Sequence, residues 1–165
     1  MTMSNAEMLA FTRELPIPIP WQRDVFIDNI AALRNRPIRL VPTDTAILAD
    51  SPCGLWVASD SVDVIMHEVG TSDYHIDQIV CHEIGHMLLG HGRGRTPDHD
   101  FRSFDALDHI LPDIDPSTVR AFLGRSDFHI EHERDAEMFA SMVMIAAAEG
   151  VAAKSVMRSV FLNRQ

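Results

Sequence analysis

The residues best suited to chemistry lie together in the HExxH motif His82-Glu83-Ile84-Gly85-His86. Residues four apart on a helix lie one turn apart on the same face, so both imidazoles can reach one metal ion. Neutral imidazole nitrogens are ligands suited to Zn²⁺. Glu83 would project beside that ion, where it can act on a water bound to it. The motif therefore predicts a zinc site with His82 and His86 as ligands and Glu83 as the catalytic base.

A hydrolytic zinc site needs a third protein ligand and keeps one position open for water. His91 is one candidate for this ligand, but its spacing differs from the metzincin pattern. On a continuing helix His91 would also face away from His82. We therefore interpret His91 as a polar residue just past the end of the helix. The alternative is that His91 closes the site as a fourth ligand.

The second candidate for the third ligand lies in the run EHERDAEMFA, residues 131–140. Glu133 and Glu137 are one turn apart there, at the end of a face of small apolar residues that includes Ala136 and Ala140. Acidic groups in such a place are costly unless something compensates them, and a bound cation would do so. Glu133 could then ligate zinc, while Glu137 could hydrogen-bond the second nitrogen of a histidine ligand. The alternative is a solvated face with local ion pairs.

The HExxH motif lies in a segment with strong helical periodicity. Asp73 is a suitable N-cap residue, and Gly90 or Gly92 can end the helix. Apolar residues recur between these ends at i, i+3 and i+4 spacing: Ile76, Ile79, Val80, Ile84, Met87 and Leu88. The neighbouring Cys81 points about 100° away from His82, so we expect a packed thiol rather than a ligand.

Three short segments read as β-strands: 38–41, 54–58 and 62–69. The last two are separated by 59–61, a length suited to a hairpin. Segment 62–69 contains His67 and Glu68, which we place on the solvent face of the strand. We also expect this strand to form an edge that pairs with an extended peptide.

Helices are expected through most of the remaining chain. Periodicity predicts one from 21 to 34, a start near Asp115, a long helix from about 129 to 149, and a last helix after a break or kink at Gly150. The alternating prolines of 16–20 favour an extended path. We therefore expect an extended arm over 1–20 and a single domain over 21–165. The fold class is α+β, with a short three-stranded sheet and a mostly helical C-terminal half.

The composition narrows the function classes. The chain has 165 residues, of which 46% are hydrophobic and 23% charged, as in ordinary globular domains. Its net charge of −10 argues against direct binding of nucleic acid. Two cysteines are too few for a disulfide scaffold, and no apolar run approaches the length of about 20 residues that spans a bilayer. The N-terminus has no secretory pattern, so we expect a cytoplasmic protein without membrane association.

Two motifs together resemble a known family. HEIGHMLLGH from residue 82, followed by E-x-x-A-x-x-F-A from residue 133, is similar to the ImmA/IrrE-type metallopeptidases. These are gluzincins, zinc peptidases in which a glutamate is the third ligand. The resemblance covers roughly 62–143 and implies a small zincin-like domain. It implies that His82, His86 and Glu133 bind zinc and that Glu83 is the catalytic base and proton shuttle. Family members often have Glu and Asn where this chain has Asp135 and Glu137.

The resemblance implies a zinc-dependent endopeptidase that cleaves a regulatory partner, often a repressor with a helix-turn-helix domain. The acidic chain would suit such a basic partner. Two alternatives stay open: a zinc-containing regulatory or interaction protein that cleaves nothing, and a hydrolase acting on another substrate. Glu83 discriminates between them, because a structural zinc site has no use for a carboxylate there. Four side chains could stabilise the oxyanion: Tyr74, His75, His129 and His132.

Overall fold

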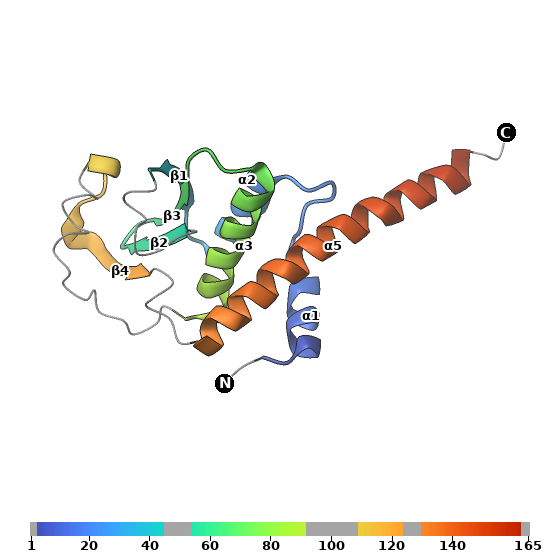
Figure 1. Ribbon diagram of the computed structural model, residues 1–165, viewed down its shortest axis with the longest axis horizontal. Coiled ribbons are helices and arrows are strands. Elements are labelled where there is room, and N and C mark those ends of the chain that lie inside the picture. The colour runs from blue at the N-terminus through green and yellow to red at the C-terminus, as the bar shows by residue number, and fades with distance from the viewer. Residues whose placement is uncertain (1–2, 45–53, 92–108, 124–129, 163–165) are drawn as a thin grey trace.

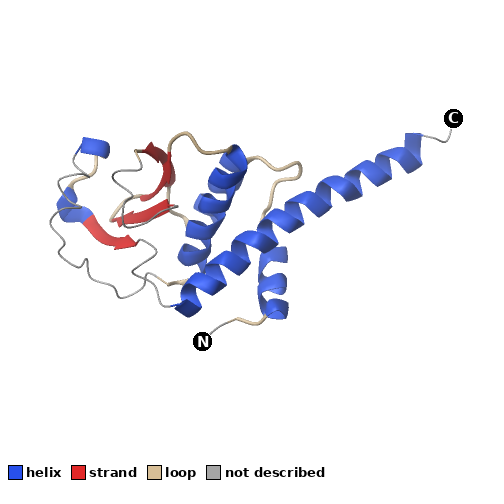
Figure 2. Ribbon diagram, viewed as in Figure 1, coloured by secondary structure: helices blue, strands red, loops and turns tan. Residues whose placement is uncertain are grey.

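The computed structural model describes residues 3–44, 54–91, 109–123 and 130–162. Within these residues the fold is α+β, as predicted, with one mixed sheet beside a group of helices (Figures 1 and 2). The helices are α1 (Asn5–Arg13), α2 (Arg23–Arg34), α3 (Asp73–Leu89) and α5 (Ile130–Leu162). The strands are β1 (Ile38–Thr43), β2 (Gly54–Ser59), β3 (Asp63–Glu68) and β4 (Val119–Leu123).

The described sheet has four strands in the order β1-β3-β2-β4. Strands β2 and β3 form the predicted antiparallel hairpin. Its turn is closed by Ser59, which donates hydrogen bonds to the Val62 carbonyl from its backbone N–H (3.1 Å) and from its hydroxyl (2.8 Å). Strand β1 joins β3 in parallel and β4 joins β2 antiparallel, so the sheet is mixed.

Strand β4 is an element that the sequence did not predict. We expected a helix from Asp115, but Asp115 accepts hydrogen bonds from the backbone N–H (2.9 Å) and hydroxyl (2.7 Å) of Ser117. This arrangement caps a single 3₁₀ turn, Pro116–Thr118, and the chain then continues as β4. Caps of this kind suit short turns and helices alike, so the sequence signal was real but its continuation was not helical.

Both faces of the two central strands are buried. Trp56 and Ile65 belong to the main core with α2, α3 and α5. The alternating neighbours point to the opposite face and form a second cluster: Leu55, Val57, Val64 and Met66, with Leu111, Ile114 and Val119. Burial on two sides explains why β2 and β3 read as continuous apolar runs rather than as alternating ones.

The expectation that segment 62–69 forms a sheet edge was wrong. Strand β3 pairs with β1 on one side and with β2 on the other, so its backbone is already bonded. Among the described strands the edges are β1 and β4. His67 is also buried rather than solvent-facing, and its Nδ1 lies 2.9 Å from the Glu68 carbonyl oxygen.

A buried carboxylate ties α2 to the hairpin. Asp63 is 1% exposed and accepts hydrogen bonds from the indole N–H of Trp56 (2.9 Å), from Arg34 (2.6 Å) and from Arg36 (2.8 Å). A buried charge is stable only when it is paired and hydrogen-bonded. This network fixes the start of β3 against the end of α2, and so orients the sheet on which α3 packs.

The N-terminal segment is not an extended arm throughout. Residues 5–13 form α1, which begins with a reciprocal capping box between Ser4 and Glu7. Met8 is fully buried, and the ring of Phe11 packs on Phe139 of α5 with a centroid distance of 6.1 Å. The extended path that the prolines predict is confined to the segment between α1 and α2.

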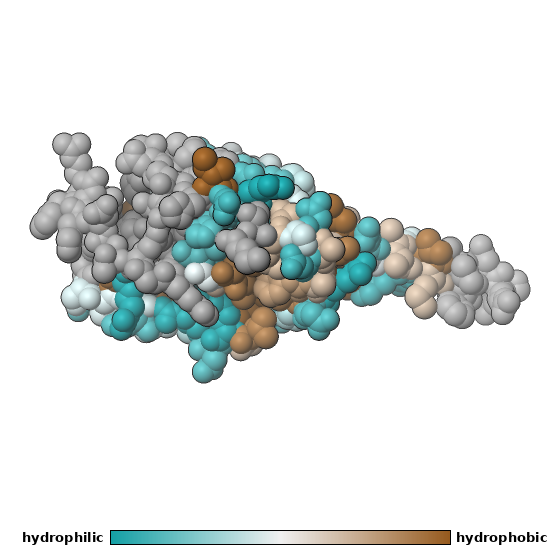
Figure 3. Space-filling view, turned by 90° about the horizontal axis from the view of Figure 1, so that it is seen from below, coloured by the Kyte–Doolittle hydropathy of each residue, from teal (hydrophilic) through white to brown (hydrophobic). Residues whose placement is uncertain are grey.

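Helix α5 runs unbroken through Gly150, so the predicted break was wrong. Gly150 instead makes room for Ile19, because a Cβ there would lie 2.2 Å from Ile19 Cδ1. Beyond this contact the helix projects from the body (Figure 1), and residues 151–158 are exposed. Hydrophobic residues alternate with hydrophilic ones along the projecting part (Figure 3).

By length and composition alone, the segment Ile130–Arg158 of α5 could cross a membrane. Core helices of soluble proteins pass the same test, and the N-terminal half of α5 packs on α1 and α3. The feature is therefore a weak indication, and the expected cytoplasmic location stays a prediction.

Candidate metal centre

Helix α3 carries the HExxH motif and confirms the predicted helix. Its N-cap is Ser72, whose hydroxyl accepts the backbone N–H of His75 at 3.2 Å, so the predicted cap Asp73 is instead the first helical residue. The helix ends at Gly90, whose φ of 72° lies in the left-handed region that favours glycine. His82 and His86 therefore lie on the last turns of a regular helix.

A close contact between two helices brings in the third side chain. At Gly85, an added Cβ would lie 3.0 Å from Phe139 Cδ1 and 3.3 Å from Ala136 Cα. The absence of a side chain at Gly85 and the small Ala136 let α5 cross close to α3, as Figure 1 shows. Glu133, in the first turn of α5, thereby reaches the two histidines of α3.

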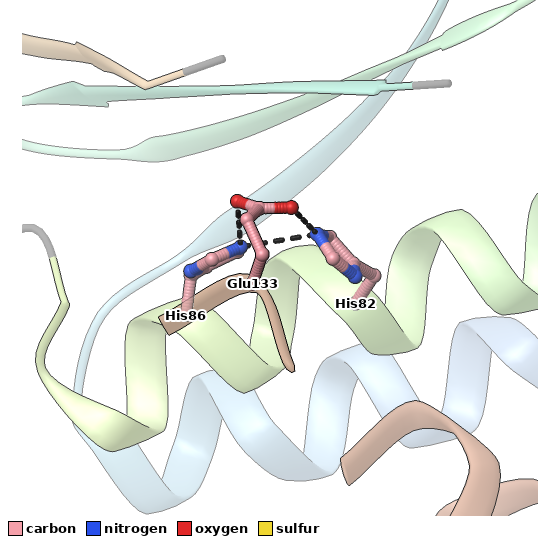
Figure 4. A group of neighbouring side chains, drawn as sticks. All are labelled: His82, His86 and Glu133. Atoms are coloured by element: carbon pink, nitrogen blue, oxygen red, sulfur yellow. Dashed lines mark hydrogen bonds and ion pairs between the residues drawn. The ribbon is translucent and has the colours of Figure 1, made fainter. Parts of the chain in front are cut away.

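Three side chains converge at this crossing (Figure 4). The Nε2 atoms of His82 and His86 are 3.0 Å apart. Glu133 places Oε1 3.2 Å from His86 Nε2, and Oε2 3.4 Å from His82 Nε2. The group could hold a metal ion, and it contains the three residues that the sequence predicted as ligands.

His82, His86 and Glu133 form a triangle of side chains whose separations are close to those around a tetrahedral ion. Bonds of about 2.0–2.1 Å from zinc to nitrogen or oxygen place neighbouring ligand atoms about 3.3 Å apart in a tetrahedron. The separations here are comparable: the two nitrogens are 3.0 Å apart, and each lies 3.2 or 3.4 Å from a different oxygen of Glu133. Within the described ranges this is the single group of its kind, and it offers three ligands rather than four. An ion held there would keep an open position.

The charges within the triangle stabilise one another. Partial burial raises the pKa of Glu133, but hydrogen bonds to His82 and His86 and the charges of these rings outweigh it and bring the pKa to about 2. Burial lowers the pKa of His82, yet the hydrogen bond that its ring donates to Glu133 and the charges of the nearby carboxylates raise the pKa overall. For His86 burial prevails and the pKa is lowered. Glu133 is therefore ionised at neutral pH and could bind a cation.

Glu83 lies beside the triangle and is almost completely buried. No hydrogen bond to its Oε2 is formed by the described residues. Burial raises the pKa of Glu83 to about 7; His82 opposes this change and Glu133 adds to it. Strand β2 approaches closely at Gly54, where a Cβ would lie 3.2 Å from Glu83 Oε1 and 2.5 Å from Ile79 Cγ2. The carboxylate is thus enclosed, with one buried oxygen available to bind a proton.

His91 lies just past the end of α3, as predicted, but its ring also packs against the centre. Its Nδ1 is 3.0 Å from Nδ1 of His86. The prediction did not foresee this contact: the left-handed Gly90 turns the chain back, so that the His91 N–H donates to the His86 carbonyl at 3.0 Å. His91 approaches the nitrogen of His86 on the far side of the ring from the triangle. It is therefore not a fourth ligand.

The other residues that the sequence singled out differ in how exposed they are. Glu137 is exposed one turn beyond Glu133, and its charge contributes to the raised pKa of His82. Its hydrogen-bonding role stays a prediction. Tyr74 is 60% exposed, and His129 lies outside the described residues. Cys81 is a buried free thiol, as predicted.

Comparisons of the chain with family models, with curated proteins and with solved structures find no match. The resemblance to the ImmA/IrrE-type metallopeptidases therefore stays a prediction, carried by the motif residues of α3 and α5. The case for function rests on the geometry of the site.

Proposed function

We propose that this chain is a zinc-dependent endopeptidase. The observation that carries the proposal is the buried carboxylate of Glu83 beside a group of three ligands. Structural zinc sites are closed by four protein ligands, whereas catalytic sites have three and keep one position for water or substrate. A structural site also gains nothing from burying an additional acid, since an enclosed carboxyl oxygen without a hydrogen bond, such as Oε2 of Glu83 among the described residues, costs stability.

His82, His86 and Glu133 would hold the ion. Zinc, when bound, would lower the pKa of a coordinated water toward neutrality and polarise the scissile carbonyl. Glu83 takes the proton of the attacking water and later delivers it to the leaving amine. The pKa of Glu83, about 7 in the metal-free chain, is near the value at which one group can both accept and donate.

We propose a regulatory protein as the substrate, such as a repressor with a helix-turn-helix domain. Two observations support this choice. The motifs of α3 and α5 resemble those of peptidases with such substrates, and the net charge of −10 favours association with a basic partner.

The test co-expresses the chain with a candidate helix-turn-helix regulator and follows the regulator by intact-mass spectrometry. Three forms are compared: wild type, Glu83→Gln, and the control Glu149→Gln, which alters an exposed carboxylate of α5. We expect wild type and the control to truncate the regulator at the same bond. Glu83→Gln should cleave about 10²–10⁴-fold more slowly, because the general base is lost.

Equal cleavage by wild type and Glu83→Gln would contradict the proposed mechanism. An intact regulator in a stable, zinc-dependent complex with all three forms would instead favour an interaction protein without proteolysis. Zinc content measured on each purified form shows whether Glu83→Gln still carries the metal, as expected for a residue that is not a ligand.

A further inference from the structure

His86 uses both of its ring nitrogens. Nε2 faces Glu133 and His82, while Nδ1 lies 3.0 Å from Nδ1 of His91. A hydrogen bond between two imidazoles requires one donor and one acceptor. Because Nε2 must offer its lone pair to bind a metal, the proton of His86 belongs on Nδ1. His86 is then the donor and His91 the acceptor, which places the proton of His91 on its Nε2.

We propose that His91 is a positioning residue that fixes the tautomer and ring orientation of His86 for metal binding. The inference rests on the proposed metal centre and adds a function for a residue outside the ligand set. Ligand histidines commonly donate their second N–H to a carboxylate, a carbonyl or water. In this chain the acceptor is a second imidazole, that of His91.

Two contacts hold the acceptor in place. The turn at Gly90 directs His91 back over α3, and its N–H bonds to the His86 carbonyl. On the other side the ring of His91 stacks on His132, with a centroid distance of 4.1 Å and an interplanar angle of 7°. His132 immediately precedes the ligand Glu133, so the stack links the end of α3 to the turn of α5 that supplies the third ligand.

The charge state of His91 agrees with an acceptor role. Burial lowers the pKa of His91 to about 4, assisted by the neighbouring rings of His86 and His132. A neutral ring has one nitrogen with a free lone pair, whereas a protonated ring would have none.

The test measures zinc affinity by competition with a chelator for wild type, His91→Ala, His91→Asn and the control His109→Ala. The side-chain oxygen of asparagine can accept a hydrogen bond from a position close to that of histidine Nδ1. The control removes an exposed histidine. We expect His91→Ala to bind zinc about 10–100-fold more weakly. His91→Asn should recover most of this loss, and His109→Ala should match wild type.

A second measurement requires no substitution. Long-range ¹H–¹⁵N spectra of the zinc-loaded wild type should show His86 protonated at Nδ1 and His91 protonated at Nε2. The opposite tautomer of His91 would overturn the proposal, even if a variant at this position failed to fold.

Three outcomes of the affinity measurements would overturn the inference. Wild-type affinity in His91→Ala would show that the contact does not matter, while the metal centre itself would stand. Equal weakening in His91→Ala and His91→Asn would indicate packing of the ring rather than its hydrogen bond. A wild type that binds no zinc would remove the metal centre, and the inference with it.

Discussion

At the scale of single residues, the centre depends on which carboxylate faces the two histidines. Glu133 and Glu137 are one turn apart on α5, but Glu133 contacts both Nε2 atoms whereas Glu137 is exposed. Glu133→Ala would remove a proposed ligand and should weaken zinc binding by more than the roughly 10–100-fold typical of outer partners. Chelator competition measures this difference.

Glu137→Ala serves as the matched variant in the same experiment. If Glu137 acts through its charge alone, its removal should change the zinc affinity only a few-fold, because exposed charges are screened. A loss of about 10–100-fold would instead support its predicted hydrogen bond to a ligand histidine. A larger loss for Glu137→Ala than for Glu133→Ala would contradict the proposed ligand set.

Glu83 should make the stability of the metal-free protein depend on pH. Its pKa is raised from 4.5 to about 7 in the folded chain. Between these values the folded state keeps a proton that the unfolded chain has released, so the free energy of unfolding falls as pH rises through this window. At about 1.4 kcal/mol per pKa unit, the loss is on the order of 3 kcal/mol.

Glu83→Gln should abolish this contribution, because an amide does not titrate. Denaturant unfolding with a chelator present measures both proteins at pH 5 and pH 8. We expect the variant to gain stability relative to wild type as pH rises from 5 to 8. Parallel pH profiles for the two proteins would show that Glu83 is not buried in the metal-free state.

At the scale of elements, the crossing of α3 and α5 determines whether the centre can form. Gly85→Ala would place a methyl group 3.0 Å from Phe139 and 3.3 Å from the backbone of Ala136. The backbone cannot yield as a side-chain tip can, so the helices should separate and Glu133 should retreat from His86. We expect weaker zinc binding and a loss of about 1–3 kcal/mol of stability from overpacking.

The matched control for Gly85→Ala is Gln78→Ala, at an exposed position of the same helix. Both changes introduce alanine, the residue with the highest helix propensity, so propensity alone would stabilise the helix in both cases. Unchanged zinc affinity and raised stability in Gly85→Ala would show that the helices are not in close contact there.

The sequence predicted the local parts of this arrangement well. Periodicity located α3, turn residues located the β2–β3 hairpin, and the spacing of the motif placed His82 and His86 on one face. It also offered Glu133 with a physical reason, a costly acid at the end of an apolar face. That the acid meets those histidines depends on the close contact at Gly85, which is a tertiary event that periodicity cannot show.

Three of the failures share a cause, because each depends on a contact between distant segments. Gly150 reads locally as a helix breaker, but it makes room for Ile19. Strand β4 forms because β2 offers it a partner, and β3 is central because β1 pairs with its free side. The role of His91 required knowledge that the chain reverses at Gly90, where a glycine is compatible with several backbone paths.

At the scale of the whole molecule, the two ends of the chain contribute differently. The C-terminal turns of α5 project from the body with residues 151–158 exposed. The N-terminal residues, in contrast, belong to the main core and pack against the same helix. Asp135 of α5 accepts a hydrogen bond from the Met3 N–H at 3.3 Å, and α1 packs beside it. The N-terminus therefore supports the part of α5 that carries Glu133.

This difference leads to a prediction for Met8 and Leu9, neighbours on α1 that are 0% and 40% exposed. Met8→Ala should lower the free energy of unfolding by about 2–5 kcal/mol, the range for truncating a large buried side chain. Leu9→Ala should change it by roughly 0.5 kcal/mol or less, as surface substitutions do. Denaturant unfolding of the metal-free proteins measures both. Equally small effects would mean that the first helix is a detachable arm, and that α5 holds Glu133 in place without support from the N-terminus.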